Sequence, residues 1–106
     1  MNDRPNLVYI FADQWRAQAA GFAGNSQVKT PVMDRFAERS FQFTNAISGY
    51  PVCSPYRAAL LTGQYPLRHG MLANDQKNIS NPVGFGDAFA RAGYRTAYIG
   101  KWHLEL

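Results

Sequence analysis

The sequence predicts an α/β fold, in which a mostly parallel sheet is flanked by helices. A nearly continuous apolar run at residues 6–12 is typical of a strand buried on both faces of such a sheet. Thr-Pro at residues 30–31 and Ser-Pro at 54–55 indicate helix starts, because proline fits the first helical position. The length of 106 residues with 46% hydrophobic residues predicts one domain with a single core.

The first predicted strand, residues 6–12, ends at Asp13 and Gln14. Ligands of open α/β sheets gather beyond the carboxyl ends of strands, so these two side chains stand where a site is expected. Residues 15–29 are rich in Ala, Gly, Asn and Ser and indicate a loop with one helical turn.

A helix is expected from Pro31 to about Ser40, with Thr30 as its N-cap. Residues 41–47 alternate at period two and predict a half-buried strand. Ser54 and the following proline repeat the cap signal and predict a short helix.

Gly63 is expected to end that helix, which places Cys53 just before its N-terminus. Residues 64–82 form a long irregular stretch of the kind that carries function. A helix is predicted at 85–92 and a last strand at 94–99.

Charge and composition exclude several classes of function. The net charge of +4 comes from basic residues scattered singly, so a nucleic acid or membrane surface is not expected as a partner, and a small anionic substrate remains open. The lone Cys53 forms no internal disulfide. No apolar run spans a bilayer, and the polar start lacks a secretory signal, which predicts a cytoplasmic protein, or a periplasmic one if the N-terminus was trimmed.

Residues 53–63, Cys-Ser-Pro-Tyr-Arg followed by a short helix and Thr-Gly, resemble the signature of the type I sulfatases. Residues 93–96 and 100–103, Gly-Tyr-Arg-Thr and Gly-Lys-Trp-His, resemble the second signature of that family. The resemblance implies the N-terminal part of an alkaline-phosphatase-like sulfatase domain. It also implies a hydrolase that converts a small sulfate ester into alcohol and sulfate.

Cys53 and Arg57 form a chemical pattern that stands without the family name. Unpaired N–H groups and the helix dipole stabilise an anionic nucleophile or oxyanion beside Cys53, and the guanidinium of Arg57 suits a tetrahedral oxyanion. A buried structural cysteine with a surface arginine is the alternative. The resemblance implies that a maturation enzyme oxidises Cys53 to formylglycine. One hydroxyl of the formylglycine hydrate would attack sulfur, and the other would allow sulfate to leave by elimination.

By the same resemblance, Asp13, Gln14 and the modified Cys53 hold a divalent cation, Ca²⁺ in most members and Mg²⁺ or Mn²⁺ in others. Most members carry a second Asp where Gln14 stands, which puts its ligation and the metal in question. The alternative for Asp13 is a loop carboxylate that caps nearby amides.

Lys101 and His103 are two residues apart at a strand exit, so in extended backbone their side chains share one face. The resemblance implies that Lys101 binds a sulfate oxygen and that His103 takes a proton from formylglycine. The alternative is a solvated lysine and a structural histidine. Asn74 is expected to contact the transferred group or to be an ordinary turn residue, and His69 is expected to be structural.

The chain, residues 1–106, is thus interpreted as a truncated N-terminal portion of one catalytic domain, inactive alone. The first alternative is a phosphonate monoester or phosphodiester hydrolase of the same superfamily, which often has Asp-Gln at the first site. The second alternative is a non-catalytic fragment that keeps only the fold. An exposed sheet edge of such a fragment predicts self-association.

Overall fold

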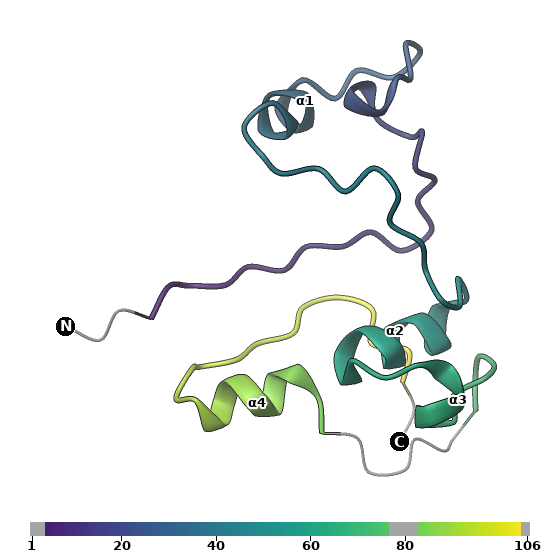
Figure 1. The fold of residues 1–106 in the computed structure, drawn as a ribbon, viewed down its shortest axis with the longest axis vertical. Coiled ribbons are helices and arrows are strands. Elements are labelled where there is room, and N and C mark those ends of the chain that lie inside the picture. Colours follow the sequence, from purple (N-terminus) through teal and green to yellow (C-terminus); the bar gives the residue numbers. More distant parts are fainter. Residues whose placement is uncertain (1–3, 77–82, 105–106) are drawn as a thin grey trace. The chain divides into compact units, whose positions relative to one another are not determined.

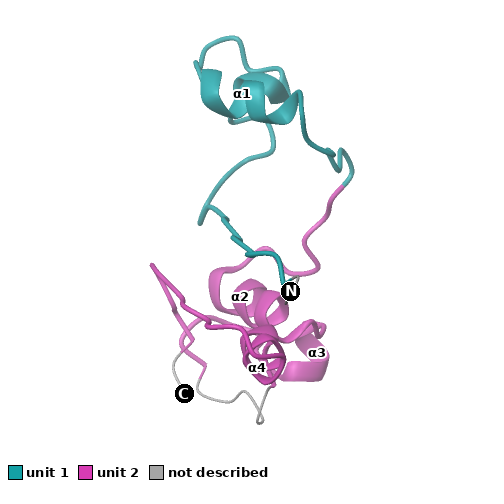
Figure 2. Ribbon diagram, turned by 90° about the vertical axis from the view of Figure 1, so that its left-hand side faces the viewer, with its two compact units in different colours: residues 1–45 teal, residues 46–106 magenta. Residues whose placement is uncertain are grey.

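The computed structural model describes residues 4–76 and 83–104 (Figure 1). Two compact units make up the chain, residues 1–45 and residues 46–106, coloured separately in Figure 2. The elements in the described ranges are, in chain order, the 3-10 turn η1 (Gly21–Ala23) and the helices α1 (Pro31–Ala37), α2 (Cys53–Thr62), α3 (Pro66–His69) and α4 (Phe85–Arg91). Within those ranges, no helix has the length and apolar character needed to cross a membrane.

In the first unit, η1 and α1 are joined by one polar cluster. The Thr30 hydroxyl accepts a hydrogen bond from the Gly21 N–H and donates one to Asp34, each 2.8 Å long. The same Asp34 oxygen accepts from the Phe22 N–H at 2.8 Å. A Cβ at position 21 would lie 2.8 Å from the other Asp34 oxygen, so this close approach requires glycine.

Helix α1 begins where the sequence predicts and ends earlier. Pro31 is its first residue, but the side chain of Thr30 does not cap it and instead connects it to η1. The helix ends at Ala37 rather than at about Ser40, because the backbone changes there to hydrogen bonds between residues three apart. The N–H of Ser40 bonds the carbonyl three residues back at 3.2 Å, in the 3-10 pattern.

In the second unit, α3 and α4 both pack against α2. The core is small: Ala58, Met71 and Leu104 are buried together, with Leu61 packed against them. The predicted stop of α2 is confirmed, since Gly63 follows Thr62 in the left-handed conformation with φ 66°. The prediction of helix 85–92 is confirmed within one residue.

Helix α3 lies inside the stretch that was expected to be irregular. Pro66 is its first residue, and the extended Tyr65 precedes it. The sequence signal was therefore the same proline signal that predicts α1, in a segment too short to show helical periodicity.

The predicted sheet is not formed among the described residues. No β-ladder occurs in the segments predicted as strands, which are residues 6–12, 41–47 and 94–99. The rings of Tyr9 and Phe11 lie 5.8 Å apart, as side chains two residues apart do in extended backbone. Ile10, expected to be buried, is 88% exposed. Periodicity identifies a segment that suits a sheet, but it does not supply the neighbouring strand whose hydrogen bonds make one.

Candidate active site

Cys53 is the first residue of α2, not the residue before it as predicted. Val52 is the N-cap, with extended backbone and no side chain that can cap the helix. Cys53 is a free thiol of intermediate burial. At this position it lies at the positive dipole end of a ten-residue helix.

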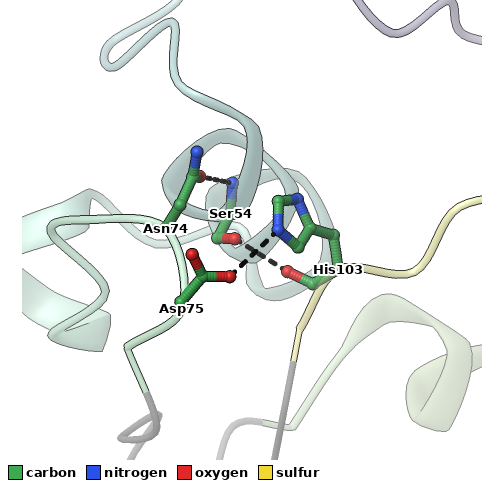
Figure 3. A network of polar contacts seen from close by, with 4 residues as sticks. All are labelled: Ser54, Asn74, Asp75 and His103. Atoms are coloured by element: carbon green, nitrogen blue, oxygen red, sulfur yellow. Dashed lines mark hydrogen bonds and ion pairs between the residues drawn. The ribbon is translucent and has the colours of Figure 1, made fainter.

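The missing local cap of α2 is replaced by a residue from a distant loop. The Asn74 side-chain oxygen accepts a hydrogen bond of 2.9 Å from the N–H of Ser54, the second residue of the helix (Figure 3). The prediction offered a substrate amide or a turn residue for Asn74, and the contact is that of an N-cap. Its oxygen is thus engaged by the helix that carries Cys53.

Ser54 also connects α2 to the C-terminal segment of the chain. Its side chain is buried, and its hydroxyl donates a hydrogen bond of 2.8 Å to the His103 carbonyl (Figure 3). The two residues are 49 positions apart in the sequence. The two signature segments, residues 53–63 and 93–103, therefore meet at the first turn of α2.

Arg57 makes the second connection between these segments. It lies one turn after Cys53 and is only 4% exposed. Its Nη1 donates to the Tyr98 hydroxyl at 2.9 Å and to the Lys101 carbonyl. The Tyr98 hydroxyl in turn donates to the same carbonyl at 2.6 Å. The guanidinium predicted to bind an oxyanion thus holds the main chain of the second signature segment.

The predicted pairing of the Lys101 and His103 side chains on one extended face is wrong in its geometry. His103 has φ 52°, in the left-handed region, so the rule that side chains two apart share a face does not apply. The carbonyl of Lys101 faces Arg57, and the carbonyl of His103 faces Ser54. The segment is therefore held through main-chain oxygens, while the Lys101 residue is exposed.

The His103 ring lies partly buried near a carboxylate. Its Nε2 is 3.4 Å from Oδ1 of Asp75, whose side chain is 77% exposed (Figure 3). Its Nδ1 is buried and has no hydrogen-bond partner among the residues that the structure describes. One ring nitrogen therefore lies beside an acid, and the other is buried without a partner in the described part of the chain.

His69 is structural, as predicted. It is 2% exposed, and its Nδ1 accepts a hydrogen bond of 3.1 Å from the N–H of Met71. Burial lowers the pKa of His69, because the charged imidazolium would lose its hydration. The ring is therefore neutral in the folded protein at pH 7.

Asp13 and Gln14 belong to the first unit, and both residues are exposed. Across residues 4–76 and 83–104, no three His, Cys, Asp or Glu side chains gather closely enough to hold a metal ion. Calcium needs six to eight oxygen ligands, and one carboxylate with one amide supplies only part of them. The described residues alone therefore do not complete the predicted cation site.

Sequence reasoning missed three residues that build this site: Ser54, Asp75 and Tyr98. The sequence indicates a helix cap for Ser54 and places Tyr98 only within the predicted strand 94–99. A hydroxyl that donates to a carbonyl far away in the sequence follows no local sequence pattern. Only the position of Tyr98, three residues before Lys101, could have indicated its contact with the Lys101 carbonyl. Asp75 directly follows Asn74, which the prediction did single out.

The sequence model of the family described as Sulfatase matches residues 5–106. The chain is 51% identical to an ulvan-active sulfatase of Formosa agariphila, over 96% of this chain and 20% of the relative. It is 38% identical to an endo-4-O-sulfatase of Bacteroides thetaiotaomicron, over 98% of this chain and 24% of the relative. It is 34% identical to a steryl-sulfatase of Homo sapiens, over 97% of this chain and 20% of the relative.

The chain thus spans about a fifth to a quarter of the length of these relatives. No solved structure matches it. The family match extends over nearly the whole sequence and includes both signature segments. The chain therefore belongs to the sulfatase family.

Proposed function

We propose that this chain carries an active-site segment of a sulfuric ester hydrolase, which converts a sulfate monoester into an alcohol and sulfate. One observation carries the proposal. The helix that begins with Cys53 is bonded through Ser54 and Arg57 to the main chain of His103 and Lys101. The two segments that match the family signatures are far apart in sequence and meet at the N-terminus of α2.

Cys53 is the proposed precursor of formylglycine, made by a separate maturation enzyme. The hydrate of this group supplies two hydroxyls on one carbon, one to attack sulfur and one that lets sulfate leave with return of the aldehyde. The dipole at the start of α2 favours negative charge at this position. The thiol is neither fully buried nor paired in a disulfide, which supports its access to a modifying enzyme.

His103 is the proposed group that takes a proton in the step that releases sulfate. An Nε2–H directed toward Asp75 would leave the Nδ1 lone pair as the acceptor, and Nδ1 has no partner among the described residues. Lys101 is proposed to neutralise a sulfate oxygen, as an exposed ammonium on a segment held by its own carbonyl.

We also infer that Asp13 and Gln14 supply two oxygens to a divalent cation, Ca²⁺ or alternatively Mg²⁺ or Mn²⁺. Its other ligands would come from elsewhere in the protein. Family membership supports an alkaline-phosphatase-like α/β fold for the whole domain. In that fold, residues 6–12, 41–47 and 94–99 are the proposed strands of a mostly parallel sheet.

A sulfated polysaccharide is the proposed substrate class. The support is the 51% identity to a relative described as ulvan-active. The steryl-sulfatase relative, at 34% identity, makes a sterol sulfate the second choice. Hydrolysis rates on ulvan oligosaccharides and on a steroid sulfate distinguish the two classes.

The proposed function is tested with the full-length protein, expressed together with a formylglycine-generating enzyme. Intact mass should report conversion of Cys53, and the matured protein should hydrolyse 4-nitrophenyl sulfate. The Cys53→Ala variant is the matched control and should have no activity. A fully converted protein that leaves every sulfate ester intact would refute the assignment.

Phosphonate monoester hydrolysis is the second candidate, because Gln14 follows Asp13 where most sulfatases have a second acid. Matched 4-nitrophenyl sulfate and phenylphosphonate esters measure this directly. A higher kcat/KM on the phosphonate would replace the first proposal by the second.

A further inference from the structure

The hydroxyl of Tyr98 sits at the centre of a closed polar contact in the second unit. It accepts a hydrogen bond of 2.9 Å from Arg57 Nη1 and donates one of 2.6 Å to the Lys101 carbonyl. Arg57 Nη1 also donates directly to that carbonyl. The ring of Tyr98 packs edge-on against Trp102, with the centroids 4.9 Å apart. A guanidinium, a phenol and a carbonyl thus form a triangle in which each group bonds the other two.

A tyrosine is well suited to this position because a phenol both donates and accepts. Arg57 is 4% exposed, and a buried guanidinium is costly unless acceptors surround it. The Lys101 carbonyl has two lone pairs and receives two donors here. Removing the phenol oxygen would take one acceptor from Arg57 and one donor from the Lys101 carbonyl.

The segment after Tyr98 depends on such contacts for its position. Gly100 lies at a bend with φ 112°, and His103 has φ 52°, so two backbone angles of this segment depart from extended geometry. The triangle at Lys101 and the hydrogen bond from Ser54 to the His103 carbonyl anchor it to α2.

We propose that Tyr98 is a positioning residue, whose hydroxyl between Arg57 and the Lys101 carbonyl sets the direction of the Lys101 and His103 side chains. This inference rests on the proposed function, in which those two side chains act on the sulfate ester. Tyr98 contacts no substrate in this scheme. It acts through the main chain of the segment that it holds.

The test uses the matured full-length protein and the probe 4-nitrophenyl sulfate, with rates expressed per formylglycine. Tyr98→Phe removes only the hydroxyl. Tyr94→Phe is the matched control. The Tyr94 ring packs against Phe89 with the centroids 5.1 Å apart, and its hydroxyl is not part of the Arg57–Tyr98–Lys101 triangle. A third variant carries p-aminophenylalanine at position 98, which restores a donor to the carbonyl. Hydrogen exchange of residues 98–103 reports the segment independently of activity.

Tyr98→Phe should lower kcat about ten- to hundredfold, because a displacement near 1 Å in a catalytic group has effects of this size. KM should stay within about threefold, since no binding group is removed. The p-aminophenylalanine variant should recover most of kcat, and Tyr94→Phe should keep it. Exchange of residues 98–103 should accelerate severalfold in Tyr98→Phe alone.

Unchanged kcat and exchange in Tyr98→Phe would overturn the inference. So would a loss that p-aminophenylalanine does not recover, or one that Tyr94→Phe shares, because either would reflect general destabilisation. If the wild-type protein hydrolyses no sulfate ester, the proposed function fails. In that case the exchange measurement alone decides whether Tyr98 holds the segment.

Discussion

Replacing Ser54 by alanine tests the contact that joins the two signature segments. The Ser54 residue is 1% exposed, and its hydroxyl donates to the His103 carbonyl at 2.8 Å. Ser54→Ala removes the donor and adds no bulk. The N–H of residue 54 can still bond Asn74, so the cap of α2 is preserved.

The expected loss is about 1–2 kcal/mol, the net value of one hydrogen bond plus part of the cost of leaving a carbonyl without a donor. With a urea m-value of about 2 kcal/mol/M, this loss lowers the unfolding midpoint by about 0.5–1 M. The proposed sulfatase activity of the full-length protein should fall as well, because His103 loses its anchor to α2.

Ser40→Ala is the matched control for that measurement. The Ser40 hydroxyl bonds the carbonyl of Phe36 at 2.7 Å, but this bond is local and exposed. Its removal should change stability by less than about 0.5 kcal/mol. Equal midpoint shifts for the two variants would refute the reasoning, because the long-range contact would then contribute no more than a surface turn.

Two further predictions concern the buried imidazole and the η1 turn. The pKa of His69 is lowered by burial, so the unfolded chain binds more protons near its ordinary value of 6.5. The contribution of His69 to the free energy of unfolding should therefore be fully present above pH 6.5 and should fall as the pH drops below it. The urea midpoint of His69→Asn should depend less on pH in this range. Gly21→Ala should cost about 1–2 kcal/mol, because its Cβ would lie 2.8 Å from Asp34. The control Gly86→Ala, in open space within α4, should instead gain up to about 1 kcal/mol in thermal unfolding.

Local signals in the sequence predicted most helix boundaries. Proline fixes the backbone angle of a first helical residue, which made the start of α1 predictable. Glycine in the left-handed region made the end of α2 predictable at Gly63. The sheet was not confirmed, because a strand needs a partner that the pattern of one segment cannot specify.

The site shows the same contrast between local patterns, which were predictable, and contacts between distant segments, which were not. Cys53, Arg57, Lys101 and His103 were identified from motifs, and the structure brings their segments together. The groups that join those segments are two main-chain carbonyls, two hydroxyls and the Arg57 guanidinium. Every residue has a carbonyl, so its use cannot be inferred from residue type. The left-handed backbone at His103 likewise has no signature in a histidine.

The distant cap of α2 has a consequence for the order of events during synthesis. Ser54 leaves the ribosome 20 residues before Asn74, whose side chain completes the first turn of the helix. At roughly 5–20 residues per second, that interval lasts about one to four seconds. During that interval the first turn of α2, which begins with Cys53, lacks the hydrogen bond from the Ser54 N–H to Asn74. The proposed maturation enzyme therefore meets Cys53 in two states, on an uncapped first turn during this interval and on the capped helix afterwards.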